Sequence, residues 1–170
     1  MVMYGIGDKV LYGSEGVMTV VDKREVTVGG VSRNYYVLKS YGGNSSSETF
    51  VPTDSEELVS KMRPLLTKSE ILKAISDAAS LDEREWSGDG RARLQRFRRA
   101  VECGDRAAMI AMMRSIYNFG RERTEQGKRL YLADETVMRR AEQIIHSEFS
   151  EVLGIPPEEI SAFIEENIGK

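Results

Sequence analysis

The spacing of apolar residues changes from a strand period to a helix period near Pro64, and this change constrains the fold more than any other feature of the chain. Before it, short clusters of β-branched and aromatic residues alternate with glycines, as in the hairpins of a sheet. After it, apolar residues recur every three or four positions, as in amphipathic helices. We therefore expect an α+β fold with two domains, residues 1–66 and residues 67–170.

The first domain is expected to contain about five short strands. Apolar clusters lie at residues 17–21, 26–28 and 35–38. Gly29 and Gly30 separate the last two clusters and predict a hairpin turn, because glycine tolerates the positive φ that such turns need. Pro52 lacks a ladder donor and should end a strand or lie at an edge. Five short strands in so few residues favour a small, strongly bent barrel.

The second domain is expected to be a bundle of four or five helices. Thr67 and Glu70 match a capping box at the start of the first helix. The others should span about 87–103, 105–119 and 134–153, with Pro156 near the start of a fifth. The inward faces should include Leu94, Phe97 and Val101, and then Ala108, Met109, Met112, Met113, Ile116 and Tyr117.

Charge is segregated along the chain, although the net charge is only -3. Residues 84–129 carry 12 basic and 6 acidic side chains, whereas residues 130–170 carry 3 and 9. A basic block of this kind can meet a polyanion even when the whole protein is acidic. The alternative is that both blocks are solvated helix faces that partly pair with each other.

Trp86, the only tryptophan, precedes a cluster of arginines at positions 91, 93, 96, 98 and 99. Arginine suits phosphate because its planar fork donates two parallel hydrogen bonds and keeps its charge. The free N–H groups at the helix start also favour an anion. An exposed indole beside such a helix can stack on a base or wedge into a minor groove. Alternatively, Trp86 packs back onto the bundle.

Catalytic motifs are not found in the sequence. It has no nucleophile elbow, no phosphate-binding loop and no second cysteine beside Cys103 to form a disulfide or a zinc site. The lone histidine, His146, has no partner at catalytic spacing, so a hydrolase would require acidic residues gathered around it in space. No leader or membrane-spanning run is visible. We expect a cytoplasmic protein that is not an enzyme and needs no metal or cofactor.

Several segments, taken in order, carry a resemblance to a known family. They are IGDKVLYGSEGVMTV, YYVLKS, FVP, Trp86-Ser87 before a basic helix, the Gly104-Asp105 break and the helix with Met112-Met113-Arg114-Ser115-Ile116-Tyr117. Their order and spacing resemble the CarD/CdnL family of bacterial transcription regulators. The N-terminal module of that family is shared with the transcription-repair coupling factor.

The resemblance implies a Tudor-like or SH3-like barrel that binds the β subunit of RNA polymerase through an exposed strand edge. Arg24, Thr49 and Phe50 match the polymerase-contacting positions of the family. It also implies a helical domain that touches promoter DNA without sequence preference. Trp86 matches the residue that enters the minor groove at the upstream edge of the melted DNA, which would stabilise the open complex.

Arg91 matches a basic position beside that tryptophan, and Arg93 and Arg98 complete the expected DNA-contacting set. Two positions depart from the family pattern: Asp89 places a carboxylate after the tryptophan, and Phe50 replaces a basic residue, which implies a more apolar polymerase contact. We expect a monomer that does not bind membranes. The alternative function is an adaptor whose helical bundle binds another protein rather than DNA.

Overall fold

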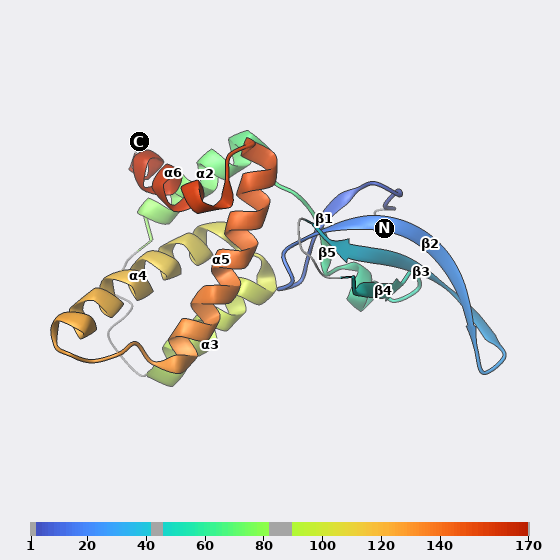
Figure 1. The fold of residues 1–170 in the computed structure, drawn as a ribbon, viewed down its shortest axis with the longest axis horizontal. Helices are drawn as coiled ribbons and strands as arrows, with labels where there is room; N and C mark the ends of the chain where they lie inside the picture. Colours follow the sequence, from blue (N-terminus) through green and yellow to red (C-terminus); the bar gives the residue numbers. More distant parts are fainter. Residues whose placement is uncertain (1–2, 42–45, 82–89, 170) are drawn as a thin grey trace. The chain divides into compact units, whose positions relative to one another are not determined.

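A computed structural model describes residues 3–41, 46–81 and 90–169 of the chain. The chain forms two compact units, Met1–Leu65 and Leu66–Lys170, which we call the sheet unit and the helical unit (Figure 1). The sheet unit consists of antiparallel strands and the helical unit of helices, so the α+β class is confirmed.

In its described residues, 3–41 and 46–65, the sheet unit contains five strands and one short helix. They are β1 (Lys9–Tyr12), β2 (Val17–Val28), β3 (Val31–Ser40), β4 (Glu48–Pro52), α1 (Glu56–Val59) and β5 (Met62–Pro64). The strands are antiparallel in the order β4-β3-β2-β1-β5, which confirms the expected strand number and the end of a strand at Pro52. No ladder joins β4 to β5 in the described residues. The sheet is therefore open, and the expected barrel is not confirmed.

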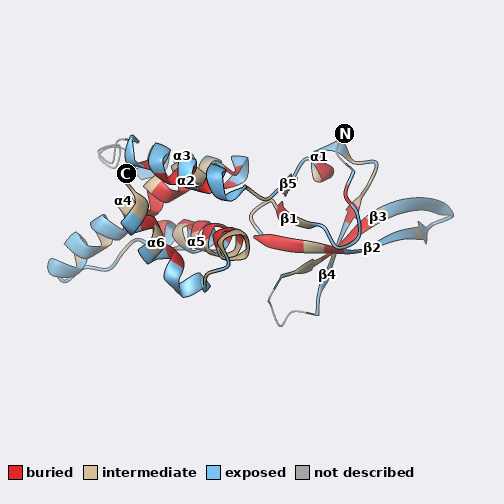
Figure 2. Cartoon of the chain, turned by 90° about the horizontal axis from the view of Figure 1, so that it is seen from above, coloured by how far each residue is buried: buried red, intermediate tan, exposed pale blue. Residues whose placement is uncertain are grey.

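The hairpin of β2 and β3 extends past the other strands, and its far end is exposed (Figures 1 and 2). Gly29 and Gly30 form its two-residue turn with φ of +59° and +80°, a conformation that L side chains rarely adopt. Counting from this turn pairs Val28 with Val31 and Arg24 with Tyr35. A bulge between Val20 and Asp22 then shifts the register by one residue.

One face of the sheet carries the core of this unit. Alternation within the strands brings Val10, Val20, Leu38 and Val51 into a buried cluster. Tyr4 lies at the edge of the cluster and donates its hydroxyl to the Met62 carbonyl at 2.6 Å. A buried tyrosine hydroxyl needs such an acceptor, so this bond ties the first described residues to β5.

The helical unit contains five α-helices in its described residues. They are α2 (Lys68–Ala79), α3 (Gly90–Cys103), α4 (Arg106–Glu125), α5 (Leu132–Leu153) and α6 (Ile160–Asn167), preceded by a 3₁₀ turn, η2 (Pro157–Glu159). The expected capping box is confirmed, because the Thr67 N–H donates to Glu70 at 2.8 Å and the Glu70 N–H donates to the Thr67 hydroxyl at 3.2 Å. Helix α4 continues past the expected end at Phe119 to Glu125, and of these added residues Arg121, Glu122, Arg123 and Glu125 are good helix formers whereas Gly120 and Thr124 are not.

The core of the helical unit lies between α2, α4, α5 and α6. Its largest fully buried side chains include Ile71, Ile75, Met109, Ile116, Ile144, Phe149 and Ile160. The expected burial of the methionines at 109, 112 and 113 is confirmed. The expectation for Tyr117 is wrong, because its side chain is 59% exposed. Ile116 occupies the interior position instead, and consecutive helix residues point about 100° apart.

A buried ion pair joins α4 to α5. Arg106 donates two hydrogen bonds to Glu148, at 2.8 and 2.9 Å, and a third to the Gly104 carbonyl at 2.9 Å. Glu148 also accepts the backbone N–H of Leu66 at 2.9 Å. The carboxylate is fully buried, and this set of donors compensates its loss of water.

Candidate functional site

Five side chains from three strands form an exposed patch beside the β4 edge of the sheet unit. We call this the edge patch, and it consists of Arg24, Tyr35, Lys39, Glu48 and Phe50. Strand register and alternation bring these residues to one face of the sheet. Tyr35 and Phe50 meet edge to face at a centroid distance of 6.0 Å.

Arg24 reaches from β2 across β3 to this aromatic pair. Its guanidinium lies 5.7 Å from the centre of the Phe50 ring, a favourable distance for a cation on a π face. It also pairs with Asp22 at 3.0 Å and with Glu48 at 3.7 Å, while Lys39 pairs with Glu48 at 3.4 Å. These ion pairs are exposed, so each contributes only about 0–1 kcal/mol and can be exchanged for contacts with a partner.

The backbone of β4 offers hydrogen bonds beside the edge patch. The Thr53 N–H donates to the Asn34 carbonyl at 2.9 Å, which sets the phase of the ladder between β3 and β4. Alternate residues of an antiparallel strand turn toward its partner. Thr49 therefore pairs toward β3, whereas Glu48 and Phe50 turn their N–H and C=O groups away from the sheet. Because β4 is the outermost strand, these groups face open space.

The structure brings together two of the three residues expected to contact polymerase. Arg24 and Phe50 lie in the edge patch, whereas Thr49 alternates with Phe50 and projects from the opposite face. Sequence reasoning missed Tyr35, although counting outward from the Gly29-Gly30 turn would have paired it with Arg24. Glu48 could have been found in the same way, since it lies two residues before Phe50.

The arginines of α3 divide between its exposed and buried sides. Arg91, Arg96, Arg98 and Arg99 are exposed. Arg93 is buried, 9% exposed, because it shares a helix face with Phe97 and Val101, one and two turns further on. Arg93 was expected in the DNA-contacting set, but its buried side chain is not available to a phosphate, so we omit it from the proposed DNA contacts.

A buried ion pair explains the position of Arg93. Its guanidinium donates to Asp134 at 2.9 Å, and Asp134 is 2% exposed in the first turn of α5. The pair ties α3 to α5, so Arg91 and Arg98 extend from an anchored helix. The ring of Phe119 lies 6.0 Å from the same guanidinium and adds α4 to this junction.

Arg123 contacts the rings of both Phe119 and Tyr131 next to this junction of α3, α4 and α5. Phe119 and Tyr131 are stacked with their centroids 6.3 Å apart, and the Arg123 guanidinium lies 4.2 Å from the Tyr131 centroid. Arg123 also donates to the Arg129 carbonyl at 2.6 Å. These contacts hold the connection between α4 and α5 against the bundle.

Trp86 and Asp89 lie outside the described residues, so the expectation that the indole is exposed stays a prediction. The segment that contains them leads directly into Gly90, the first residue of α3. Arg91 and Arg98 are thus the described members of the expected DNA-contacting set that remain exposed.

His146 forms a hydrogen-bonded pair with Ser161, with 3.2 Å between the imidazole Nε2 and the hydroxyl oxygen. Burial lowers the pKa of His146, and the nearby carboxylate of Glu142 partly opposes this shift. Within the described residues, no carboxylate accepts a hydrogen bond from the imidazole. The pair joins α5 to α6.

Comparison with known protein families assigns the sheet unit. Residues 4–65 match the CarD-like/TRCF RID domain. These residues belong to the CarD-like/TRCF RID family. The match covers every strand of the sheet unit, including the edge patch. The match is confined to the sheet unit, and it supports a CarD-like, polymerase-interacting and transcription-related protein.

The remainder of the chain has no such assignment. No curated protein matches the chain significantly. The match to the RID domain ends at residue 65, the last residue of the sheet unit. None of the helices in residues 3–41, 46–81 and 90–169 is long and apolar enough to cross a membrane.

Proposed function

We propose that the RID domain docks on the β subunit of RNA polymerase through β4 and the edge patch. The observation that carries this proposal is the position of Phe50, whose ring lies under Arg24 while its backbone faces outward from the outermost strand. A strand of the partner can then add to β4 by main-chain hydrogen bonds. Phe50 and Arg24 supply the side-chain selectivity of this contact.

The helical unit, in this proposal, presents Trp86, Arg91 and Arg98 to promoter DNA. Arg91 and Arg98 contact phosphates without reading sequence, and Trp86 enters the minor groove at the upstream edge of the melted region. Docking on polymerase raises the local concentration of DNA around this weak contact. The protein thereby stabilises the open promoter complex, and it acts as a monomer in the cytoplasm.

The docking step is tested by measuring binding of the full chain to the isolated β subunit. Phe50→Ala should weaken binding roughly 5- to 30-fold, the effect of removing an aromatic anchor worth about 1–2 kcal/mol. Arg24→Glu should weaken it similarly. Arg33→Glu is the matched control, because Arg33 is also an exposed hairpin arginine in an ion pair, at 3.2 Å from Asp54. Equal losses for Arg33→Glu and Arg24→Glu would contradict the proposed site.

The DNA step is tested with the same preparations and a polymerase–promoter complex. Trp86→Ala should shorten the lifetime of the open complex and leave binding to the β subunit unchanged. The double variant Arg91→Ala/Arg98→Ala should shorten it less, since phosphate contacts are individually weak. If the lifetime of the open complex is unchanged by all three substitutions, the result would favour the adaptor function, in which the helical unit binds another protein.

A further inference from the structure

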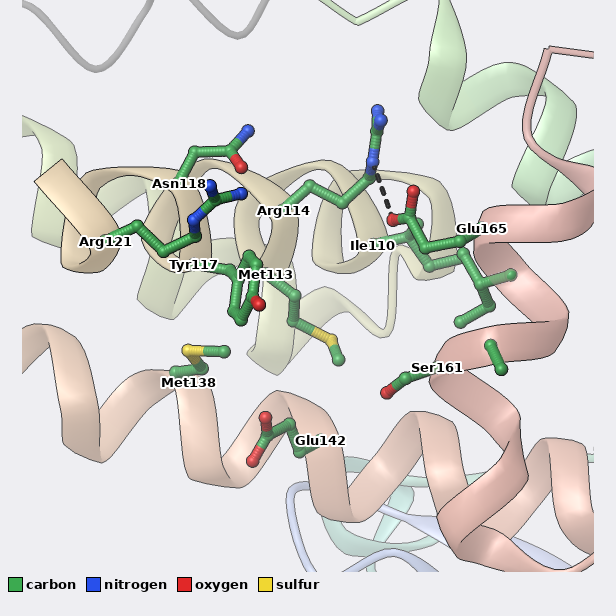
Figure 3. A pocket seen from close by; sticks show the side chains of 12 residues that line it. Ile110, Met113, Arg114, Tyr117, Asn118, Arg121, Met138, Glu142, Ser161 and Glu165 are labelled. Carbon is green, nitrogen blue, oxygen red and sulfur yellow. Dashed lines mark hydrogen bonds and ion pairs between the residues drawn. The ribbon is translucent and has the colours of Figure 1, made fainter.

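A hollow of about 530 Å³, lined by both apolar and polar side chains, lies between α4, α5 and α6 (Figure 3). Its apolar lining comes from Ile110, Met113 and Tyr117 of α4, Met138 of α5 and Ile164 of α6. Tyr117 projects from α4 toward Met138 on α5, whereas the Met113 side chain points toward the side of the hollow where Ser161 lies (Figure 3). The exposure of the Tyr117 ring, which was expected to lie inside, places an aromatic surface at this opening.

A second hollow of about 470 Å³ continues the first along α4. The two share Tyr117, Arg121 and Met138, and the second extends over Gly120 to Leu130. We call the pair the α4–α5 groove. Along α4 it runs from Ile110 to Thr124, which at 1.5 Å per residue is about 21 Å, or roughly four helical turns. That length suits another helix better than a compact small molecule.

The rims of the groove carry opposite charges. On the α4 side, Arg121 is exposed and has no ion pair or hydrogen bond among the described residues. On the α5 side, the carboxylate of Glu142 lines the same hollow. At the α6 end, Arg114 and Glu165 already pair with each other at 3.1 Å. The groove therefore has the solvent-exposed guanidinium of Arg121 on one rim and the carboxylate of Glu142 on the other.

We propose that the α4–α5 groove binds an amphipathic helix of a partner protein. The apolar stripe of that helix lies on the exposed ring of Tyr117 and on the half-buried side chain of Met138. An acidic side chain on one flank pairs with Arg121, and a basic side chain on the other flank pairs with Glu142. This is the helix-in-groove mode, in which apolar anchors supply affinity and flanking charges select the partner. The proposal does not depend on polymerase or DNA binding.

The experiment titrates the full chain into a fluorescein-labelled helical peptide of about 16 residues, enough to fill four turns. The peptide carries a leucine stripe, glutamates along one flank and lysines along the other, and binding is followed by anisotropy. We expect a Kd of about 10 µM for the wild type. Ala162→Trp, which fills the groove from the exposed surface of α6, should weaken binding about tenfold or more.

Charge reversal provides the sharper test. Arg121→Glu and Glu142→Arg should each weaken binding about three- to tenfold, because each leaves a like charge opposite the peptide flank. The double variant Arg121→Glu/Glu142→Arg should restore binding to within about twofold, since the peptide can lie in the reverse direction and exchange its flanks. Lys68→Glu on α2 is the control and should leave binding unchanged.

Three results would overturn the proposal. The first is no binding by the wild type at concentrations up to about 100 µM. The second is a loss in the double variant as large as the sum of the single losses. The third is an equal loss for Lys68→Glu, which would indicate a nonspecific charge effect. Arg121 and Lys68 are exposed, so their substitutions should not disturb the core of the helical unit. Circular dichroism should show the same helical content in each variant as in the wild type.

Discussion

Arg93 and Arg98 lie five residues apart on α3 and have opposite environments. Arg93 is 9% exposed and bonded to Asp134, whereas Arg98 is exposed. The cluster of arginines is therefore not a uniform basic surface. Residue type alone treats the five arginines alike, but the helix face that contains Phe97 and Val101 places Arg93 inside. The environment of a charged side chain is decided by its helix face.

A second residue with an unusual environment is His146, and it predicts a pH dependence. Burial lowers the pKa of His146 in the folded state below the ordinary value of 6.5. Well above pH 6.5, the imidazole of His146 is neutral in both the folded and the unfolded state, so its burial does not lower the free energy of unfolding. As the pH falls through 6.5, the unfolded chain binds a proton that the folded chain resists, so the free energy of unfolding decreases. We expect this loss to begin as the pH falls below about 7.5 and to grow until the pH passes the lowered pKa of His146, as measured by urea denaturation.

The matched variant is His146→Gln, which does not titrate and can still bond to Ser161. It should lose less stability than the wild type over the same pH interval. Carboxylates elsewhere titrate mainly at lower pH and affect both proteins equally. If the two proteins lost the same stability on acidification, the folded-state pKa of His146 would not be lowered.

Among the helices, α4 and α5 depend on each other through the pair of Arg106 and Glu148. Glu148→Ala leaves a buried guanidinium without its carboxylate and frees the Leu66 N–H. We expect the free energy of unfolding of the helical unit to fall by about 3–5 kcal/mol, measured by urea denaturation and circular dichroism at 222 nm. A loss of this size is a large part of a typical domain's stability.

Two further variants separate the causes of that loss. Glu135→Ala removes an exposed carboxylate that pairs with Arg139 one turn away, and it should cost less than about 1 kcal/mol. The double variant Arg106→Met/Glu148→Leu removes both buried charges and should recover much of the loss. If the double variant is less stable than Glu148→Ala, the loss in the free energy of unfolding comes mainly from removing the ion pair rather than from leaving Arg106 unpaired.

Much of the element pattern follows from local chemistry. Thr67 and Glu70 fix the start of α2, and Gly154, with a φ of +69°, ends α5 where its sequence position predicts. Gly29 and Gly30 set the register of the β2–β3 hairpin. The bulge beyond Val20 and the short helix α1 have no comparable signal. They depend on which side chains can be buried together, including Val59.

For the whole molecule, the charge segregation predicts how it meets DNA. The net charge of -3 opposes strong binding, so the protein alone should bind duplex DNA weakly. The logarithm of the binding constant should fall with the logarithm of salt concentration by about 0.9 for each phosphate contacted. Arg91→Ala/Arg98→Ala should therefore reduce that slope by about two, measured by anisotropy with a labelled duplex.

The control for this measurement is Arg33→Ala, which removes one positive charge from the sheet unit. It should leave the salt slope nearly unchanged, because the proposal places no phosphate at Arg33. The prediction fails if the double variant keeps the wild-type slope. Binding would then arise from other basic residues of the chain, and α3 would not be the DNA-facing helix.

The amino-acid sequence by itself determined the two-part organisation, the five strands and the longer helices, several caps and turns, and the resemblance to a polymerase-binding family. These properties depend on neighbours a few residues away and on backbone preferences. The tertiary structure decided that Arg24 meets Phe50, that Arg93 is buried, and that Tyr117 opens onto a groove. Those outcomes depend on register, sheet edges and helix packing, where residues far apart in the chain compete for the same interior space.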